Sequence, residues 1–142
     1  MKPYGKRAAK FLKPEPFNAA AHDEEHDVRI LHYTTETTLV TTAGVPLYPL
    51  RGKTMLRARV QATGAPSGAA LAADILIDGQ TAFASIDSKL QIRDGVAIGA
   101  PAYFMGGRSV PSDAKVQCKI DTISAATGPV VFEIEYVAEV GD

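Results

Sequence analysis

The segment from His22 to His26, with the sequence His-Asp-Glu-Glu-His, contains the residue types best suited to chemistry in this chain. Its spacing matches the inverted zinc-protease motif H-x-x-E-H, in which two imidazoles four residues apart bind one metal ion from the same side of a helix. Here Pro14 and Pro16 interrupt the surrounding segment, and neither an apolar helix face nor a distal carboxylate ligand accompanies it. We therefore interpret the match as coincidental and expect neither a bound metal nor a cofactor.

The other reactive side chains are scattered rather than clustered. A calcium loop needs acids at alternate positions, whereas the central acids are spaced like strand-face and turn residues: Asp74, Asp78, Asp87 and Asp94. Ser109 and Ser112 lack the G-x-S-x-G context of a hydrolase nucleophile, and every His precedes position 33. We expect the acids to be solvated or to form turns, and we expect the chain not to be an enzyme.

Two segments alternate strictly between apolar and polar residues, as half-buried strands do. The first places Leu56, Ala58 and Val60 on one face and Arg57, Arg59 and Gln61 on the other. The second places Phe132, Ile134, Tyr136 and Ala138 on one face and Glu133, Glu135 and Glu139 on the other. Both patterns predict a strand with one face against a core.

Further apolar runs between turn signals predict the remaining strands, about eight in all at the spacing of an antiparallel sandwich. The expected strands cover residues 28–34, 37–42, 55–62, 71–77, 81–86, 96–102, 115–123 and 130–140, and residues 90–92 end at a second turn. Asp78-Gly79 favours a type I′ hairpin turn, and residues 105–113 are expected to form loops. These elements predict an all-β fold, an antiparallel β-sandwich that is jelly-roll-like.

The composition is that of one globular domain with an appendage. The chain has 142 residues, of which 46% are hydrophobic, and its formal net charge of −1 does not favour a polyanion as partner. We find no apolar run long enough for a membrane span and no secretory signal. Cys118 lies on the apolar face of an expected strand, so we expect a buried thiol, no disulfide and a reducing site of synthesis.

Residues 1–26 are predicted to form an extended N-terminal arm before a sandwich domain over residues 27–142. Basic residues precede the first acid, Glu15, and acids from Asp23 onward reverse the sign of the charge. The apolar residues of this segment have no core periodicity. We expect the arm to bind an acidic protein surface rather than nucleic acid, with a solvated tail as the alternative. Its binding residues would be Lys2, Lys6, Arg7, Lys10, Phe11, Leu12, Lys13 and Phe17.

Turn and strand motifs follow one another between residues 54 and 138. They are Thr63-Gly64-Ala65-Pro66-Ser67-Gly68, then Ala73-Asp74-Ile75-Leu76-Ile77-Asp78-Gly79 with Phe83, and then Leu90-Gln91-Ile92-Arg93-Asp94-Gly95. Their order resembles a β-sandwich module of tailed-phage virion proteins, with Asp-Gly where that group usually has Asn-Gly. The resemblance implies a capsid decoration (cement), fibre or tail component without catalysis. It includes no counterpart of the arm and transfers no active-site residue.

The leading hypothesis is a head decoration protein on the capsid exterior of the virion, made in the host cytoplasm, that binds the major capsid protein or another virion protein. One alternative is a neck, tail or head-fibre subunit. Another is a carbohydrate-binding module, although the chain has no Trp. The resemblance, together with Leu76, Val131 and Val137 on otherwise polar faces, also predicts a homo-oligomer, a trimer.

Overall fold

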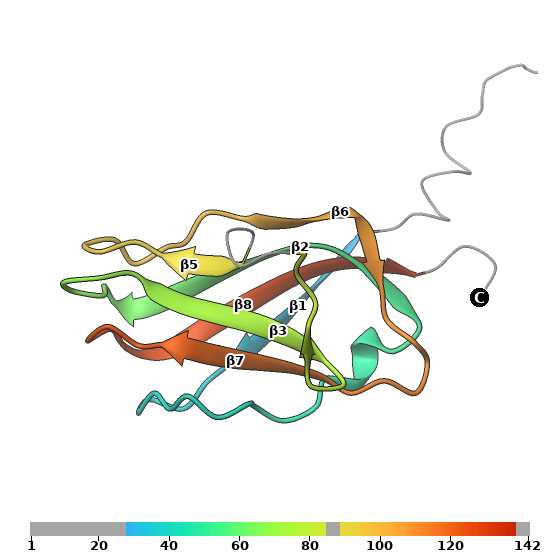
Figure 1. Cartoon of the computed structure of the whole chain (residues 1–142), viewed down its shortest axis with the longest axis horizontal. Coiled ribbons are helices and arrows are strands. Elements are labelled where there is room, and N and C mark those ends of the chain that lie inside the picture. The colour runs from blue at the N-terminus through green and yellow to red at the C-terminus, as the bar shows by residue number, and fades with distance from the viewer. Residues whose placement is uncertain (1–27, 85–88, 139–142) are drawn as a thin grey trace, which may run out of the picture. The chain divides into compact units, whose positions relative to one another are not determined.

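The computed structural model describes residues 28–84 and 89–138, which form two stacked antiparallel sheets (Figure 1). The predicted arm, the segment from His22 to His26, and Asp87 lie outside the described residues. A single 3-10 helix, η2 (Tyr48–Leu50), accompanies the strands in this part of the chain. No helix within it is long and apolar enough to cross a membrane.

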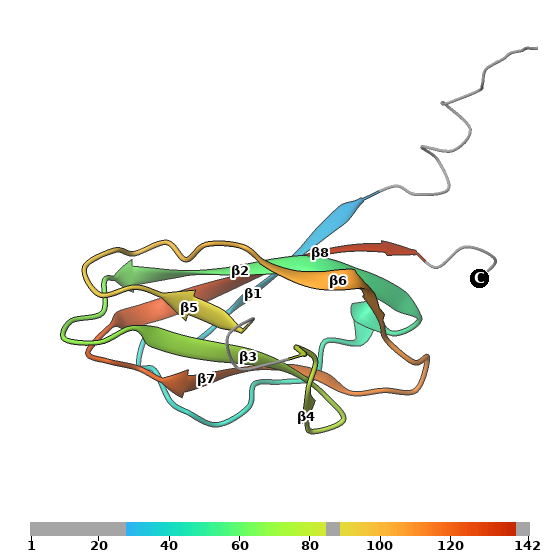
Figure 2. The same ribbon diagram turned by 45° about the horizontal axis from the view of Figure 1, so that its top comes forward.

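The strands are β1 (Arg29–Thr34), β2 (Lys53–Gly64), β3 (Leu71–Ile77), β4 (Gln80–Thr81), β5 (Leu90–Ile92), β6 (Ala102–Ser109), β7 (Val116–Thr122) and β8 (Thr127–Ala138). Sheet A has the order β1-β8-β2-β6. In sheet B, β3 is the central strand. It pairs with β7 on one side and with both β4 and β5, at different residues, on the other side. Figure 2 shows the two sheets as separate layers.

The chain passes repeatedly from one sheet to the other. After β1, the backbone N–H groups of Gly44 and Leu47 donate to the carbonyls of Cys118 and Val116, both at 2.8 Å, so this segment lies along the free edge of β7. The chain then forms β2 in sheet A, β3 to β5 in sheet B, β6 in sheet A, β7 in sheet B, and finally β8 between β1 and β2. This path is that of a jelly roll, so the predicted fold class is confirmed.

The core lies between the sheets and takes alternate residues from each. The largest fully buried side chains include Met55 of β2, Ile75 of β3, and Phe132 and Ile134 of β8. The predicted inward positions of Phe132 and Ile134 in the central part of β8 are therefore confirmed. Cys118 is buried as well, as predicted, and burial raises the pKa of its thiol.

The inner face of β2 differs from the prediction at its first residues. Met55 pairs with Tyr136 and Arg57 pairs with Glu135, so two steps along β2 match one step along β8. Leu56 is the extra residue of this β-bulge. It is only half-buried, and Met55, at 0% exposure, takes the core position predicted for Leu56.

The structure also differs from the prediction in four other segments. Residues 37–42 form no strand, because the contact with β7 begins only at Gly44. Of the strand expected over residues 81–86, the described residues 81–84 form strand only at Thr81, the end of β4, because the chain turns inward to bury Phe83. Of the strand expected over residues 96–102, residues 96–101 contribute only a bridge between Ile98 and Gln61, and β6 begins at Ala102. Much of the loop expected over residues 105–113 belongs to β6, which bulges between Tyr103 and Arg108.

Replacing Gly79 by valine is expected to lower the free energy of unfolding by about 1–3 kcal/mol. Asp78 and Gly79 have φ values of 51° and 83°, and Ile77 pairs directly with Gln80, as in the predicted type I′ hairpin. A Cβ at Gly79 would meet no atom within 4 Å, so the loss would come from backbone strain alone. Urea denaturation measures it. The matched control, Gly79→Asn, should lose much less, because Asn tolerates the left-handed region; equal losses would contradict this account.

Candidate functional site

The outer side of sheet A, turned away from sheet B, carries side chains in regular rows. Directly opposed residues of an antiparallel sheet project to the same side, so the register defines each row. The first row is Ile30, Glu135, Arg57 and Tyr103. The second is His32, Glu133 and Arg59, and the third is Thr34, Val131, Gln61 and Ile98. These three rows are called the sheet A face below.

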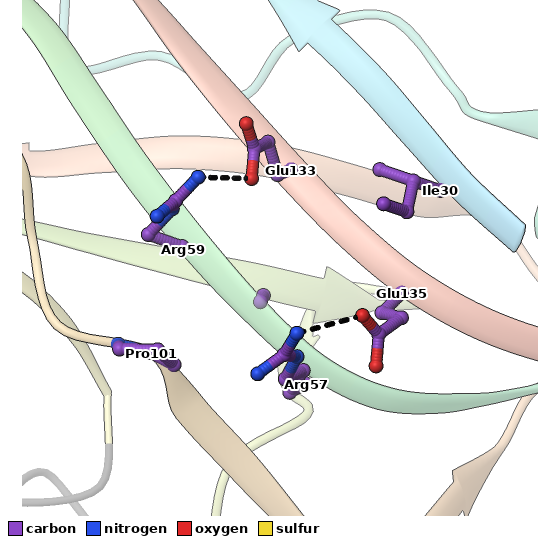
Figure 3. Close-up of a pocket in the computed structure, with 7 residues that line it drawn as sticks. Ile30, Arg57, Arg59, Pro101, Glu133 and Glu135 are labelled. Atoms are coloured by element: carbon purple, nitrogen blue, oxygen red, sulfur yellow. Dashed lines mark hydrogen bonds and ion pairs between the residues drawn. The ribbon is translucent and has the colours of Figure 1, made fainter. Parts of the chain in front are cut away.

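Two ion pairs occupy the middle of the sheet A face (Figure 3). Arg57 Nη2 donates to Glu135 Oε2 at 2.9 Å, and Arg59 Nη2 donates to Glu133 Oε1 at 2.7 Å. His32 Nε2 lies 3.6 Å from the second oxygen of Glu133. The paired side chains are 21–43% exposed, so water screens them and the pairs contribute little to stability.

Tyr103 ends the first row on the side of β6. The guanidinium carbon of Arg57 lies 6.0 Å from the centroid of the Tyr103 ring, within the range of a cation-π contact. The hydrogen bond to Glu135, and after it the hydrogen bond to Tyr103, raises the pKa of Arg57 above its ordinary value. Arg57 is therefore always charged, and neighbours on two sides hold it in place.

Apolar side chains flank the ion pairs at both margins of the sheet A face. Ile30 of β1 is 54% exposed, whereas Ile98 and Tyr103, on the side of β6, are 53% and 56% exposed. A shallow hollow of about 190 Å³ lies over the ion pairs, between Ile30 and Pro101 (Figure 3). The face thus combines an acidic column on β8 and a basic column on β2 with two apolar margins.

A larger groove of about 700 Å³ lies beside the β6 margin, between β5 and residues 96–103. Its lining includes the apolar residues Val96, Ile98 and Pro101, the ring of Tyr103, and the polar or basic residues Lys89, Gln91 and Arg93. An exposed aromatic ring beside hydrogen-bonding groups can contact a ligand with both apolar and polar parts.

Asp74 of β3 is the one charged residue that is fully buried among the described residues, at 3% exposure. Its Oδ1 accepts hydrogen bonds from the Thr81 hydroxyl at 2.7 Å and from the Ile75 N–H at 2.8 Å. Lys89 Nζ lies 3.0 Å from Oδ2. The prediction of a solvated or turn-forming acid is therefore wrong for Asp74. Its contacts join β3, β4 and the residue before β5, which indicates a structural role.

The other two described acids among the four central ones, Asp78 and Asp94, accept hydrogen bonds from backbone N–H groups at turns. Asp78 Oδ1 accepts from the Lys115 N–H at 2.9 Å, and Asp94 Oδ1 accepts from the Gly68 N–H at 3.1 Å. No group of three or more His, Cys, Asp or Glu side chains within residues 28–84 and 89–138 could hold a metal ion.

Ser109 and Ser112 lie at the end of β6 and in the loop that follows it. His32 is on β1 and Ser109 is at the end of β6, and these strands form opposite edges of sheet A. Ser112 follows β6, in the loop that leads to β7. Ser109 instead pairs across the sheet with Thr54. His32 and Ser109 therefore do not lie on neighbouring strands.

The partner-binding residues predicted in the arm all lie outside the described residues, so they remain a prediction. The sheet A face was not predicted as a site. Its signal was present in the sequence, because Arg57 and Arg59 alternate on one strand as Glu133 and Glu135 do on another. The sequence does not reveal that β2 pairs with β8. This pairing brings together residues that are far apart in the chain, such as Arg57 and Glu135, which are 78 positions apart.

Comparison of the sequence with protein-family models and with curated proteins gives no match. Function is therefore inferred from the fold, the sheet A face and the sequence motifs.

Proposed function

We propose that this chain is a structural protein of a tailed-phage virion, a head decoration (cement) protein that binds the outer capsid surface and stabilises the shell. The observation that carries the proposal is a contact between two turns on which the resemblance to virion modules rests. Gly95 N donates to Pro66 O at 3.0 Å, and Gly68 N donates to Asp94 Oδ1 at 3.1 Å. Motifs that are 26 residues apart thus meet in one hydrogen-bonded pair of loops.

The remaining motif residues build the framework of the sandwich. Asp78-Gly79 forms the turn between β3 and β4. Phe83 stacks on Phe104, with ring centroids 4.7 Å apart, and Leu90 and Ile92 of β5 are fully buried. The residues that carry the resemblance therefore have structural roles, which is what a scaffold protein requires of them.

A decoration protein needs a rigid body and a means of adhesion. The packed core and the hydrogen-bonded loops supply the rigid body. The composition of residues 1–26 is suited to adhesion, because it combines basic groups with apolar residues that lack core periodicity. A fully extended segment of about 25 residues reaches roughly 80 Å, enough to contact a neighbouring capsid subunit. The same reasoning applies to a neck, tail or fibre subunit, which differs in its position on the particle.

Carbohydrate binding is the second candidate function. The observation in its favour is the exposed Tyr103 ring at the 700 Å³ groove, with Gln91 and Lys89 in the same lining. Such a ring can stack on a sugar while nearby polar groups bind hydroxyls. A glycan array tests this function: a defined glycan signal that Tyr103→Ala abolishes would support it, and a blank array would contradict it.

Deleting residues 2–20 is expected to leave a folded, soluble domain that no longer binds capsids. The reason is that the deletion removes the basic and apolar groups proposed to contact the shell, while the described strands begin only at Arg29. Co-sedimentation with empty heads, assembled from the major capsid protein of the same phage, measures binding. A matched variant with Lys6, Arg7 and Lys10 all changed to Gln isolates the electrostatic part.

Full binding by the truncated chain would contradict the role of the arm as tether. The decoration function itself would be contradicted if the intact chain stayed in the supernatant with the same heads. The two failures are distinguishable because the intact and the truncated chains are compared on one preparation of heads.

A further inference from the structure

In the first row of the sheet A face, apolar residues stand at both ends and an acidic residue stands beside a basic one in the middle. Reversing the row exchanges the acid and the base and leaves the apolar ends in place. The first row runs from Ile30 through Glu135 and Arg57 to Tyr103, which is apolar, acidic, basic, apolar. Read in reverse, it is apolar, basic, acidic, apolar. A surface with this order is complementary to a copy of itself, as an isologous two-fold interface requires.

One orientation of a second copy uses this complementarity. The two-fold axis must run parallel to the strands, between two facing sheets, midway between β8 and β2. It then sets Glu135 of each copy over Arg57 of the other, and Ile30 over Tyr103. The second row follows the same rule. A two-fold axis across the strands would instead set the acidic column of β8 on itself, and like charges in contact cost several kcal/mol.

The ion pairs retain hydrogen-bonding capacity for a partner. The contact between Arg59 and Glu133 uses one Nη2 donor and one carboxylate oxygen, whereas a guanidinium has five N–H donors and a carboxylate about four acceptor sites. In the facing arrangement, the remaining donors lie opposite carboxylates, so the charges stay compensated when water is excluded. The same association would also bury the exposed apolar side chains of Ile30, Ile98 and Tyr103, which is favourable.

The size of the face limits its affinity. Four strands about 4.8 Å apart and about seven residues at roughly 3.3 Å each cover an area of about 19 by 23 Å. Each copy would therefore bury about half of the area that one partner contributes to a standard interface. Interfaces of this size belong to weak, transient complexes, so a reversible dimer is expected.

We propose that the sheet A face binds the sheet A face of a second copy, forming a two-fold dimer in which the acidic column of each copy covers the basic column of the other. This arrangement differs from the trimer that the resemblance predicts. It also stands apart from the proposed virion function, since it depends only on the described rows.

Two charge-reversed variants of the full chain test the dimer. Glu133→Lys with Glu135→Lys gives a face with basic groups only, and Arg57→Glu with Arg59→Glu gives one with acidic groups only. Sedimentation equilibrium up to about 500 µM should show a wild-type dimer. Each variant alone should associate at least about tenfold more weakly, because like charges meet. An equimolar mixture of the two should recover the dimer, because every basic column then faces an acidic one.

Circular dichroism checks that both variants are folded, which is expected because exposed ion pairs contribute little to stability. A wild-type chain that stays monomeric over the whole range, or that forms trimers, overturns the proposal. So does dimerisation by both folded variants at wild-type strength.

Cross-linking provides a second measurement that leaves the charges intact. A thiol cross-linker of about 10 Å, the spacing of facing sheets, should join the Ile30→Cys variant to the Tyr103→Cys variant in a mixture. It should not join Ile30→Cys to itself, because the proposed axis places the two copies of this residue at opposite margins. Cys118 is buried and does not compete for the reagent. Cross-linking of Ile30→Cys alone, with none in the mixture, would overturn the orientation.

Discussion

Replacing Phe132 by alanine is expected to lower the free energy of unfolding by about 3–5 kcal/mol. Phe132 is 0% exposed, and it belongs to β8, which pairs with β1 on one side and β2 on the other. Its ring centroid lies 6.0 Å from that of Tyr33. The cavity left by the ring would persist, because backbone pairing on both sides of β8 prevents the sheets from closing around it. Urea denaturation of dilute protein measures the loss.

The neighbouring residue Val131 provides the matched control. Its side chain is half-buried and projects to the opposite side of the same strand. Val131→Ala should therefore cost less than about 1 kcal/mol. If the two substitutions cost the same, the core does not lie between the two sheets as described.

Replacing Lys89 by methionine is expected to lower the free energy of unfolding by about 3 kcal/mol, the lower end of the cost of breaking a buried ion pair. The Asp74 side chain, 5% exposed, would lose its oppositely charged partner Lys89, whose side chain is 22% exposed in the intact protein. The hydrogen bonds from Thr81 and Ile75 would remain but would not neutralise the carboxylate. Chemical denaturation at neutral pH measures the effect.

A double variant separates the loss of packing from the loss of charge compensation. Asp74→Leu with Lys89→Met leaves no buried charge, so it should recover much of the stability that Lys89→Met loses. If Lys89→Met is as stable as the wild type, or if the double variant is the less stable of the two, the ion pair does not have this role.

The parts of the fold that depend on local chemistry could be predicted from the sequence. The alternation of Phe132, Glu133, Ile134 and Glu135 specifies which side chains enter the core. Asp78-Gly79 specifies a hairpin turn through the φ values that its two residues tolerate. Neither inference needs information about distant strands, and both are confirmed.

The parts that depend on pairing between distant segments could not be predicted. Gly106 and Gly107 resemble a loop in sequence and have positive φ values, yet they form an irregularity within β6, where glycine often marks a bulge. The bulge at Leu56 reverses the inward and outward positions at the start of β2 and appears only in the register with β8.

The sheet A face also combines a feature that the sequence reveals with one that only strand pairing reveals. The charges of β2 and β8 could be read separately, but their row order exists only once the strands are neighbours.

Cryo-electron microscopy of particles from a phage whose genome carries the gene for this chain, as the proposal requires, tests the central claim most directly. Particles that carry the protein should be compared with particles from which its gene has been deleted. The decoration function predicts regularly arranged difference density on the outer surface of the head, of a size that fits the jelly-roll domain. Difference density at the neck, the tail or the fibres, or no difference at all, would contradict it.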